Sequence, residues 1–425
     1  MMQEIIHPLT GDRVFKGVHP SGLTVFVWPR KEARSVYAVF ATRYGSVNNT
    51  LPAPDGTETV PAGIAHYLEH KLFESEDGDA FARFAATGAS ANAYTSFDRT
   101  AYLFQATENI RPSLDILLDF VRQPYFTEET VRTEQGIIGQ EIRMGEDNPG
   151  HRLLFDMLGG MYHDHPVRLD IAGTVESIAD ITPELLYRCY NEYYAPDNMA
   201  LSVAGHITPE EVWDAVDKAF AARPAPAHPP RPVPVFPAEE PAGIVTDRVE
   251  SAMAVAAPLF YLGYKAPYRP ATPADRAGAA ILDELIAGRT GPLYERLMAQ
   301  GLINPGFGSE NFDGPGYNVW LFGGESADPE RAAALIREEI CRLQKEGIDG
   351  KLLDILRRGV YGRTVAGFDD PENCAEYLLD DWLYGFSPVE DLTALAALTP
   401  ADVERQLREQ FPADRSTLCI IRPQA

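Results

Sequence analysis

The sequence lacks the long apolar run that a membrane-spanning helix requires. A span needs about 20 apolar residues in succession, and the 425-residue chain has no window that approaches this length. The first residues, MMQEIIHPLTGDRVF, also lack the apolar stretch behind a positively charged start that marks a secretory signal. The sequence alone therefore predicts a cytoplasmic protein with no membrane among its partners.

Cysteine and lysine are scarce as well. The four cysteines lie far apart and form no CxxC pair, which predicts buried free thiols in a reducing compartment rather than a disulfide framework: Cys189, Cys341, Cys374 and Cys419. Only seven lysines are present, and the formal net charge is −25. A surface this acidic argues against nucleic acid and anionic membranes as partners.

Proline, in contrast, is concentrated in one segment. Eight of the 22 residues in AARPAPAHPPRPVPVFPAEEPA, residues 221–242, are proline, so the segment predicts an extended, semi-rigid linker. It separates an N-terminal domain, residues 1–220, from a C-terminal domain, residues 243–425. Each half mixes strand-like text such as SVYAVFATRYG or GYNVWLFGGES with periodic helical text. The fold class predicted is α+β, with two similar domains and a diverged internal duplication as a hypothesis. The stretch GSENFDGPG, residues 308–316, is interpreted as turns.

The most informative stretch is GIAHYLEHKLFE, residues 63–74. A helix of about three turns places His66, Glu69 and His70 on one face, with Pro61 suited to its first turn. Two imidazoles one turn apart can both reach one zinc ion, and the glutamate between them can move a proton to and from water. The spacing HxxEH is the inverzincin signature. The alternative is an ordinary helix with two solvated histidines.

A third metal ligand is expected from another helix. Residues 126–149 predict one, with Thr127 as its cap and Asn148-Pro149 as its stop. Glu134 and Glu141 lie seven residues apart, on one stripe of that helix. Gly136 and Gly139 lie between them and are expected to let another backbone approach closely. From the residues alone, both glutamates could equally be solvated.

These segments together resemble the pitrilysin/insulinase family of metallopeptidases, which includes mitochondrial processing peptidase. AHYLEH is similar to the zinc motif of the family, EQGIIGQEI to its downstream glutamate segment, and GASANAYTSFDRTAYLF to its edge strand. The resemblance covers most of the chain and implies two similar α/β-sandwich domains per chain. It also implies a zinc-dependent endopeptidase that hydrolyses short unfolded peptides.

The resemblance assigns roles to individual residues. By that match His66, His70 and Glu141 would bind one zinc ion per chain, and Glu69 would be the general base. Glu134 would be a supporting acidic residue at the catalytic centre. Asn92 and Ala93 fall at the positions of the edge strand that contact the substrate. An extended peptide can gain main-chain hydrogen bonds from such an edge largely regardless of its side chains.

One family feature is missing from this sequence. Full activity usually needs an arginine and a tyrosine seven residues apart in the second domain, and here Arg296 is followed at that distance by Ile303. Tyr317 is the next tyrosine after Tyr294. Some bacterial members divide the work between two chains, so the resemblance implies a zinc-bearing subunit with a related partner that carries the pair. A stand-alone homodimeric peptidase and a non-catalytic assembly subunit are the alternatives.

Overall fold

The chain forms two compact units, each built from several segments. The structure is a computed structural model and describes residues 2–6, 10–53, 56–76, 78–223, 240–385 and 388–424. Most of the predicted linker lies outside these residues. Unit 1 contains residues 1–140, 170–234 and 364–389, and unit 2 contains residues 141–169, 235–363 and 390–425.

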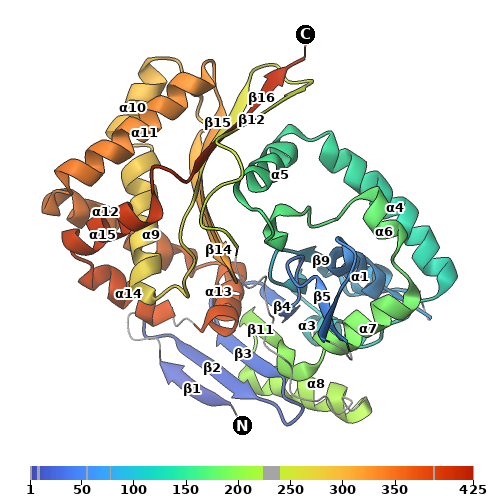
Figure 1. Ribbon diagram of the computed structural model, residues 1–425. Helices are drawn as coiled ribbons and strands as arrows, with labels where there is room; N and C mark the ends of the chain where they lie inside the picture. The colour runs from blue at the N-terminus through green and yellow to red at the C-terminus, as the bar shows by residue number, and fades with distance from the viewer. Residues whose placement is uncertain are drawn as a thin grey trace. The chain divides into compact units, whose positions relative to one another are not determined.

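Unit 1 is built on a mixed seven-stranded sheet with the order β1-β2-β3-β11-β4-β10-β9 (Figure 1). All neighbours are antiparallel except β3 and β11. Strands β4 and β11 are buried along their whole length because they are continuous runs of small and apolar residues. The strands are β1 (Gln3–Ile6), β2 (Arg13–Val18), β3 (Thr24–Pro29), β4 (Val36–Thr42), β9 (Ser90–Thr95), β10 (Thr100–Ala106) and β11 (Met199–Gly205).

Helices pack against this sheet and against one another. Two short antiparallel pairs, β5 (Thr50–Ala53) with β6 (Gly56–Thr59) and β7 (Glu74–Ser75) with β8 (Gly78–Asp79), lie in the connections. The helices are α1 (Ile64–Leu72), α2 (Ala80–Thr87), α3 (Ile110–Phe120), α6 (Val175–Ala179), α7 (Pro183–Tyr193), α8 (Pro209–Ala222) and α13 (Pro371–Tyr384), with the first part of α4 (Glu128–Glu146).

Unit 2 is built on a five-stranded sheet with the order β12-β16-β13-β15-β14. Its strands are β12 (Arg248–Met253), β13 (Leu259–Lys265), β14 (Gly308–Gly314), β15 (Tyr317–Glu325) and β16 (Ser416–Pro423). Its helices are α5 (Pro149–Met161), α9 (Pro273–Ala287), α10 (Pro292–Ala299), α11 (Pro329–Glu346), α15 (Pro400–Gln410) and most of α12 (Gly350–Gly367) and α14 (Pro388–Ala397).

The two sheets share one design. The order β3-β11-β4-β10-β9 matches β12-β16-β13-β15-β14, with one parallel pair followed by three antiparallel pairs in each. Among the described residues, two α-helices precede the edge strand in both copies, and five lie between its hairpin partner and the next strand of the sheet. The predicted α+β class and the duplicated design are therefore confirmed.

The two copies exchange their third helix after the hairpin. Helix α5 belongs to the first half of the sequence, yet it packs on β13 and β16 of unit 2. A Cβ added to Gly263 on β13 would lie 2.1 Å from Cε of Met161, so α5 is in direct contact with the sheet. Helix α13 belongs to the second half and packs on the sheet of unit 1, where Ser202 Oγ donates to the carbonyl of Ala375 at 2.8 Å. The compact units thus differ from the contiguous ranges 1–220 and 243–425, and those boundaries remain a prediction about the sequence repeat.

Residues 308–316 were expected to form turns, and that expectation is wrong. Residues Gly308–Gly314 form β14, the edge strand of unit 2, and only Pro315 and Gly316 make the turn to β15. The strand contains Gly, Asn and Asp because it is largely exposed and buries few side chains. Backbone pairing with β15 therefore outweighs the low strand propensity of these residues.

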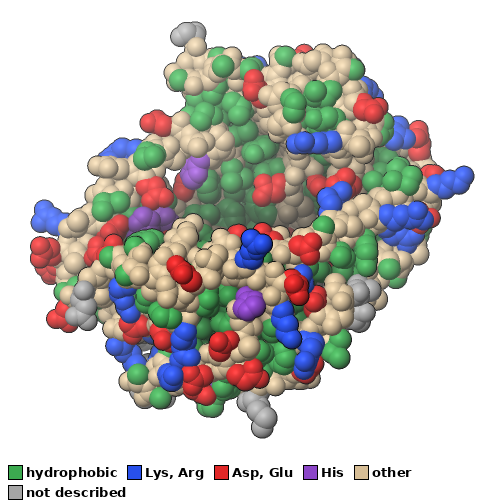
Figure 2. Space-filling model, turned by 180° about the vertical axis from the view of Figure 1, so that it is seen from behind, with side chains coloured by type: hydrophobic (Ala, Val, Ile, Leu, Met, Phe, Trp, Pro, Cys, Tyr) green, Lys and Arg blue, Asp and Glu red, His purple; other side chains and the backbone are tan. Residues whose placement is uncertain are grey.

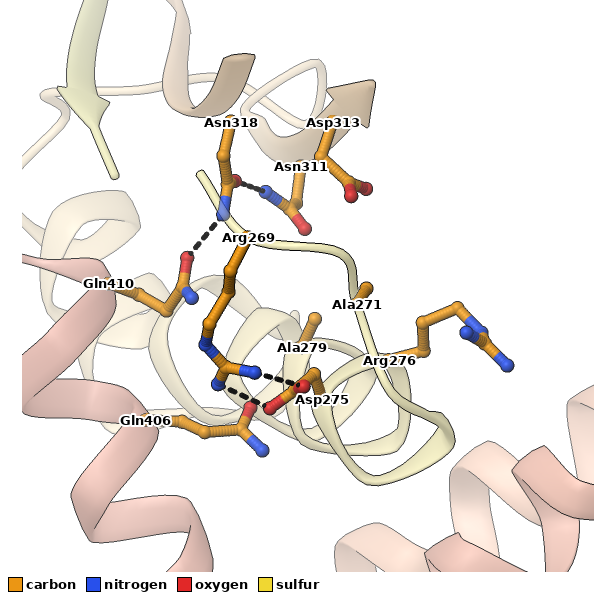
Figure 3. Close-up of a pocket in the computed structure, with 10 residues that line it drawn as sticks. All are labelled: Arg269, Ala271, Asp275, Arg276, Ala279, Asn311, Asp313, Asn318, Gln406 and Gln410. Atoms are coloured by element: carbon orange, nitrogen blue, oxygen red, sulfur yellow. Dashed lines mark hydrogen bonds and ion pairs between the residues drawn. The ribbon is translucent and has the colours of Figure 1, made fainter. Parts of the chain in front are cut away.

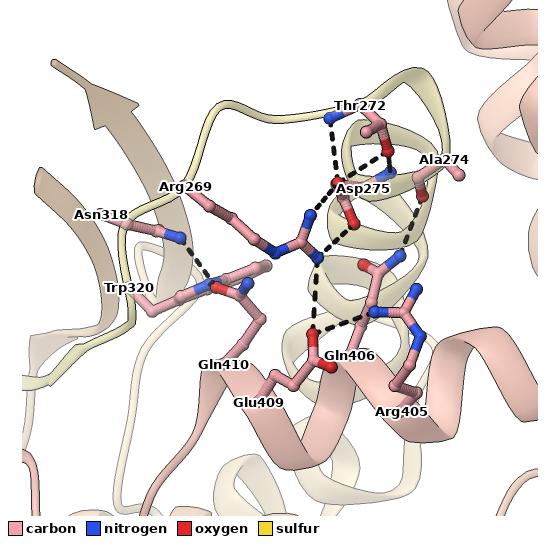
Figure 4. Close-up of polar contacts among 10 residues, drawn as sticks. All are labelled: Arg269, Thr272, Ala274, Asp275, Asn318, Trp320, Arg405, Gln406, Glu409 and Gln410. Atoms are coloured by element: carbon pink, nitrogen blue, oxygen red, sulfur yellow. Dashed lines mark hydrogen bonds and ion pairs between the residues drawn. The ribbon is translucent and has the colours of Figure 1, made fainter. Parts of the chain in front are cut away.

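A polar network fastens α15 to the start of α9 within unit 2. Arg269 donates two hydrogen bonds to the carboxylate of Asp275, one of them at 2.7 Å, and a third to Glu409 at 3.4 Å (Figures 3 and 4). Burial alone would raise the pKa of Asp275, but hydrogen bonds from Arg269 and Thr272 hold it at about 2. Gln406 donates to the carbonyl of Ala274 at 2.9 Å. Arg269 and Arg276, which line the polar pocket in Figure 3, bond to Glu409 and Asp391, so they join α9 and its preceding loop to other segments of unit 2. We therefore attribute this pocket to packing.

The formal net charge of −25 does not appear as one acidic patch on the face shown in Figure 2. Acidic and basic side chains are interspersed over the visible face in Figure 2 rather than gathered by sign. Among the described helices, none combines the length and apolar character needed to cross a bilayer. The four thiols are free, as predicted, but only three of them are buried, because Cys341 is exposed. Burial raises the pKa of Cys189 to about 11, so that thiol is protonated at neutral pH.

Candidate metal centre

Helix α1 carries the three HxxEH residues on one face, and most of the residues in this helix are buried. It begins at Ile64, later than predicted, because Gly63 adopts a left-handed φ of 92° and stops the helix from including Pro61. A Cβ at Gly63 would lie 2.3 Å from the carbonyl oxygen of Ala172, so only glycine fits there. Ile64, Leu68 and Leu72 are buried in the core.

His66 and Glu69 are buried, and His70 is partly exposed. His66 and Glu69 are each only 8% exposed, and the rings of His66 and His70 lie 4.6 Å apart between centroids. The predicted alternative, a helix with two freely solvated histidines, does not describe this arrangement.

Helix α4 crosses close to α1 and carries both candidate glutamates. It spans Glu128–Glu146, and Thr127 caps it by accepting a hydrogen bond from the Thr130 amide at 3.2 Å, as predicted. The Tyr67 hydroxyl on α1 donates to the carbonyl of Val131 on α4 and so joins the two helices. At Gly136 an added Cβ would meet no atom within 4 Å, so the expected close approach of another backbone does not occur there.

The two glutamates occupy different environments. Glu134 is 6% exposed, and its Oε1 lies 2.9 Å from Nδ1 of His70. Glu141, two turns further along, is exposed and offers its carboxylate to the histidines. Ligand atoms of His66, His70 and Glu141 all lie within 4.8 Å of one another, the one such group of three found among the described residues.

This donor set fits a catalytic zinc ion. Two imidazoles and one carboxylate are a known set for zinc sites that keep a fourth position open for water or substrate. The carboxylate of Glu134 on Nδ1 of His70 fixes the ring and leaves Nε2 for a metal, which is the usual support for a metal-binding histidine. The geometry is therefore compatible with the ligand assignment made from the sequence.

Glu69 has a partner that sequence reasoning did not single out. Oγ1 of Thr95, the last residue of β9, donates a hydrogen bond to Oε2 of Glu69 at 2.9 Å. Beneath this pair the hydroxyls of Tyr102 and Tyr194 lie 2.9 Å apart. Burial, together with Tyr194 and Glu69, raises the pKa of Tyr102 well above its ordinary value, so Tyr102 stays neutral. The only sequence signal for Thr95 was its place in the predicted edge strand.

Strand β9 is an edge strand, as predicted. It pairs with β10 on one side and ends the sheet on the other, and α1 packs against it. Asn92 and Ala93 lie in its middle. The amide of Ala93 donates to Oδ1 of Asn92 at 2.9 Å rather than to the ladder with β10. The strand therefore has an open side on which a further strand could pair, although contact of these two residues with a substrate stays a prediction.

The residues considered for an arginine–tyrosine pair already make contacts with other residues of unit 2. Arg296 donates from Nη2 to the carbonyl of Leu335 at 3.3 Å. Ile303 and Tyr317 are 7% and 3% exposed, and Tyr317 packs against His165 and Phe312.

Comparison with known proteins decides the family. The model described as "Insulinase (Peptidase family M16)" matches residues 57–175, and the one described as "Peptidase M16 inactive domain" matches residues 180–360. A Bacillus subtilis (strain 168) protein named "Uncharacterized zinc protease YmfH" is 38% identical over 411 residues, covering 95% of each chain. The chain belongs to the M16 peptidase family.

Other members of the M16 family agree. The B. subtilis zinc protease YmxG is 32% identical over 164 residues, which cover 37% of this chain and 40% of YmxG. A crystal structure described as that of an M16-like peptidase from Alicyclobacillus acidocaldarius has a TM-score of 0.92 and 32% identity, covering 100% of this chain and 99% of that one. A Helicobacter pylori protease structure with 21% identity and a TM-score of 0.84, covering 97% and 100%, shares the fold. The family resemblance seen in the sequence is therefore confirmed.

Proposed function

We propose that this M16 family member is a zinc-dependent endopeptidase that hydrolyses short unfolded peptides. The observation that carries the proposal is the convergence of His66, His70 and Glu141 next to Glu69. A bound zinc ion would supply a Lewis acid that lowers the pKa of a water molecule and polarises a peptide carbonyl. The names of the relatives, which include several zinc proteases, support this choice of metal.

The residues of the chain divide the remaining work. His66, His70 and Glu141 hold the metal, and Glu134 orients the ring of His70. Glu69 takes a proton from water and later delivers it to the leaving amine. The open side of β9, at Asn92 and Ala93, holds the peptide extended beside α1. Because main-chain hydrogen bonds supply much of this binding, the substrate must be unfolded but need not have one sequence.

We further propose that the active form is a heterodimer with a related chain. The support is the absence of an arginine–tyrosine pair at the expected spacing. Of the nearest candidates, Arg296 is half-buried and donates to the carbonyl of Leu335, and Tyr317 is buried in unit 2. A missing donor to the developing oxyanion typically costs about 10²–10³ in rate. The partner would supply that donor.

The decisive experiment compares the zinc-loaded chain with its Glu69→Gln variant on a pool of unstructured peptides, with zinc content measured for both. We expect one zinc per chain in both proteins. Cleavage should be slow or absent with the chain alone, should appear when the partner is added, and should be lost in Glu69→Gln.

Each alternative gives a different result. Full cleavage by the lone wild-type chain, abolished in Glu69→Gln, would identify a stand-alone homodimeric peptidase. A Glu69→Gln variant that behaves as wild type in every assay would identify an assembly subunit, and the peptidase proposal would fall.

A further inference from the structure

Thr95 makes a hydrogen bond whose direction is set by its surroundings. Its Oγ1 lies 2.9 Å from Oε2 of Glu69 and 3.4 Å from Oγ1 of Thr100. The Thr100 hydroxyl donates its own proton to the carbonyl of Tyr44 at 2.7 Å. The proton of Thr95 is left with two acceptors, and the closer one is a carboxylate. Hydrogen bonds to an ionised acceptor are the stronger kind, so this proton goes to Glu69.

The hydroxyl of Thr95 is held in place independently of Glu69. Thr95 forms the last pair of the β9–β10 ladder, opposite Thr100. The loop that follows is fastened to residues 45–47, where the Val47 amide donates to the carbonyl of Phe97 at 2.9 Å. A Cβ on Gly45 would lie 2.5 Å from the amide nitrogen of Asp98, so the two loops are in backbone contact. Strand β9 therefore holds the Thr95 hydroxyl without help from Glu69, and the hydroxyl in turn positions the Glu69 carboxylate.

The neighbouring residue fixes the strand from its other face. The Tyr94 hydroxyl donates to Oε2 of Glu376 at 3.0 Å, and Tyr37 donates to Oε1 of the same carboxylate at 3.0 Å. Glu376 lies on α13, which packs on β4 and β11. Alternate side chains of β9 are thus tied to α1 and to α13, while the main-chain edge at Ala93 stays available.

We propose that Thr95 is a positioning residue for the proposed peptidase reaction. Its hydroxyl holds Oε2 of Glu69, which leaves Oε1 as the oxygen that exchanges a proton with water. This proposal rests on the proposed role of Glu69. Because the strand that would receive the peptide also carries Thr95, one rigid element aligns the scissile bond and the base. A small misplacement of a reacting group can cost about 10²-fold in rate.

The test uses a matched pair of variants. Thr95→Val keeps the branched shape that suits a strand and removes the hydroxyl, whereas Thr95→Ser keeps the hydroxyl. Each variant is loaded with cobalt(II), and its electronic absorption is compared with that of wild type and Glu69→Gln. The same proteins are then assayed on unstructured peptides in the assembly that cleaves them. Cobalt stoichiometry and the thermal midpoint verify that every variant is folded.

The expected result is a split between the two variants. Thr95→Val should bind cobalt fully, show a spectrum displaced from wild type in the direction of Glu69→Gln, and lose about 10–100-fold in kcat with little change in KM. Thr95→Ser should overlay wild type in the spectrum and stay within about threefold in kcat, since it keeps the hydrogen bond.

Failures of the two proposals can be told apart. A Thr95→Val variant with the spectrum and kcat of wild type would overturn the positioning role, as would a Thr95→Ser variant that falls as far as Thr95→Val. If the wild-type chain binds no cobalt, or if cleavage survives Glu69→Gln, the proposed function itself fails and the positioning role fails with it.

Discussion

Five strands of the unit 1 sheet have the same order and pairing as the five strands of unit 2. The first helix after the matching strands β4 and β13 nevertheless differs sharply between the two units. In unit 1 this helix is α1, with the sequence IAHYLEHKL, and in unit 2 it is α9, with the sequence PADRAGAAILDELIA. Both pack against the edge strand of their sheet. Only α1 carries histidine. The same sheet design occurs twice, but the donor set is found once among the residues that the structure describes. Function thus lies in a site placed on a fold and not in the fold itself.

The same contrast holds for the second helix of the site. Helix α4 corresponds to α12 by chain order, and each is the second helix after the hairpin. Helix α4 brings Glu134 and Glu141 to α1, whereas α12 has the sequence GKLLDILRRGVYGRTVAG and a single acidic residue, Asp354. Unit 2 does place a hydroxyl of its edge strand on a half-buried carboxylate, Ser309 on Asp283, but among the described residues no histidine-containing group of metal ligands is found there. The difference predicts that metal chemistry is confined to helices α1 and α4 and is absent from α9 and α12.

The largest expected effect comes from removing the site from unit 1. His70→Ala should abolish stoichiometric zinc binding, because two donors remain where zinc sites use three or four. Glu134→Gln should bind zinc about 10–100-fold more weakly, since it loses the carboxylate that orients His70. Zinc content after dialysis and competition with a chromogenic chelator measure both.

The matched control lies on α9. Glu284→Gln changes a carboxylate on the corresponding helix and should leave zinc binding at the wild-type value. If Glu284→Gln loses zinc as His70→Ala does, or if His70→Ala keeps one zinc per chain, the contrast between the two helices is wrong.

A smaller effect should follow from closing the open side of β9. The Ala93 amide donates to the side chain of Asn92 and not to β10, so Ala93→Pro removes a donor from the open side and leaves the ladder intact. A substrate that pairs with this edge would lose about one main-chain hydrogen bond, or roughly tenfold in affinity. Binding of a dye-labelled unstructured peptide to the Glu69→Gln background, followed by anisotropy, measures this without turnover.

Ala93→Ser serves as the control for this strand, because it changes the side chain and keeps the amide. It should bind the peptide like its parent. Equal affinity for Ala93→Pro and Ala93→Ser would mean that the peptide does not use the Ala93 amide.

Sequence reasoning recovered the parts of the structure that rest on local pattern. The HxxEH spacing placed His66, Glu69 and His70 on one helical face, and Thr127 was recognised as a cap, because both depend on neighbours within one or two turns. The buried strands were clear from their apolar runs. Strand β14 was missed, since an exposed edge strand carries no apolar pattern and owes its conformation to β15.

Contacts between distant segments were beyond the sequence. The exchange of α5 and α13 depends on tertiary packing, and no local signal marks Gly263 or Ser202 as contacts for a helix from the other half. The choice between Glu134 and Glu141 as a ligand could not be made from spacing, because both lie on the same stripe of α4. Thr95 was missed for the same reason, since its acceptor lies 26 residues earlier in the chain.

The smallest expected effect is a difference between the two units in how pH changes the free energy of unfolding. In unit 2 the pKa of Asp275 is held at about 2, below its ordinary value of 3.8. The charged carboxylate therefore contributes stability above pH 3.8 that is lost as the pH falls towards 2. In unit 1 burial raises the pKa of Glu376 above its ordinary value of 4.5, although the two tyrosine hydrogen bonds act in the opposite direction. Its contribution to stability declines as the pH rises above 4.5.

Two substitutions isolate these opposite slopes. Asp275→Asn should lower the free energy of unfolding by roughly 1–2 kcal/mol near pH 7 and approach wild type as the pH falls towards 2. Glu376→Gln removes a carboxyl group whose ionisation is opposed by burial. The stability of this variant relative to wild type should therefore rise between pH 4 and pH 7. Urea unfolding across this pH range gives both differences. If they changed with pH in the same direction, the two carboxylates would not differ in the way that the arginine partner of Asp275 and the burial of Glu376 imply.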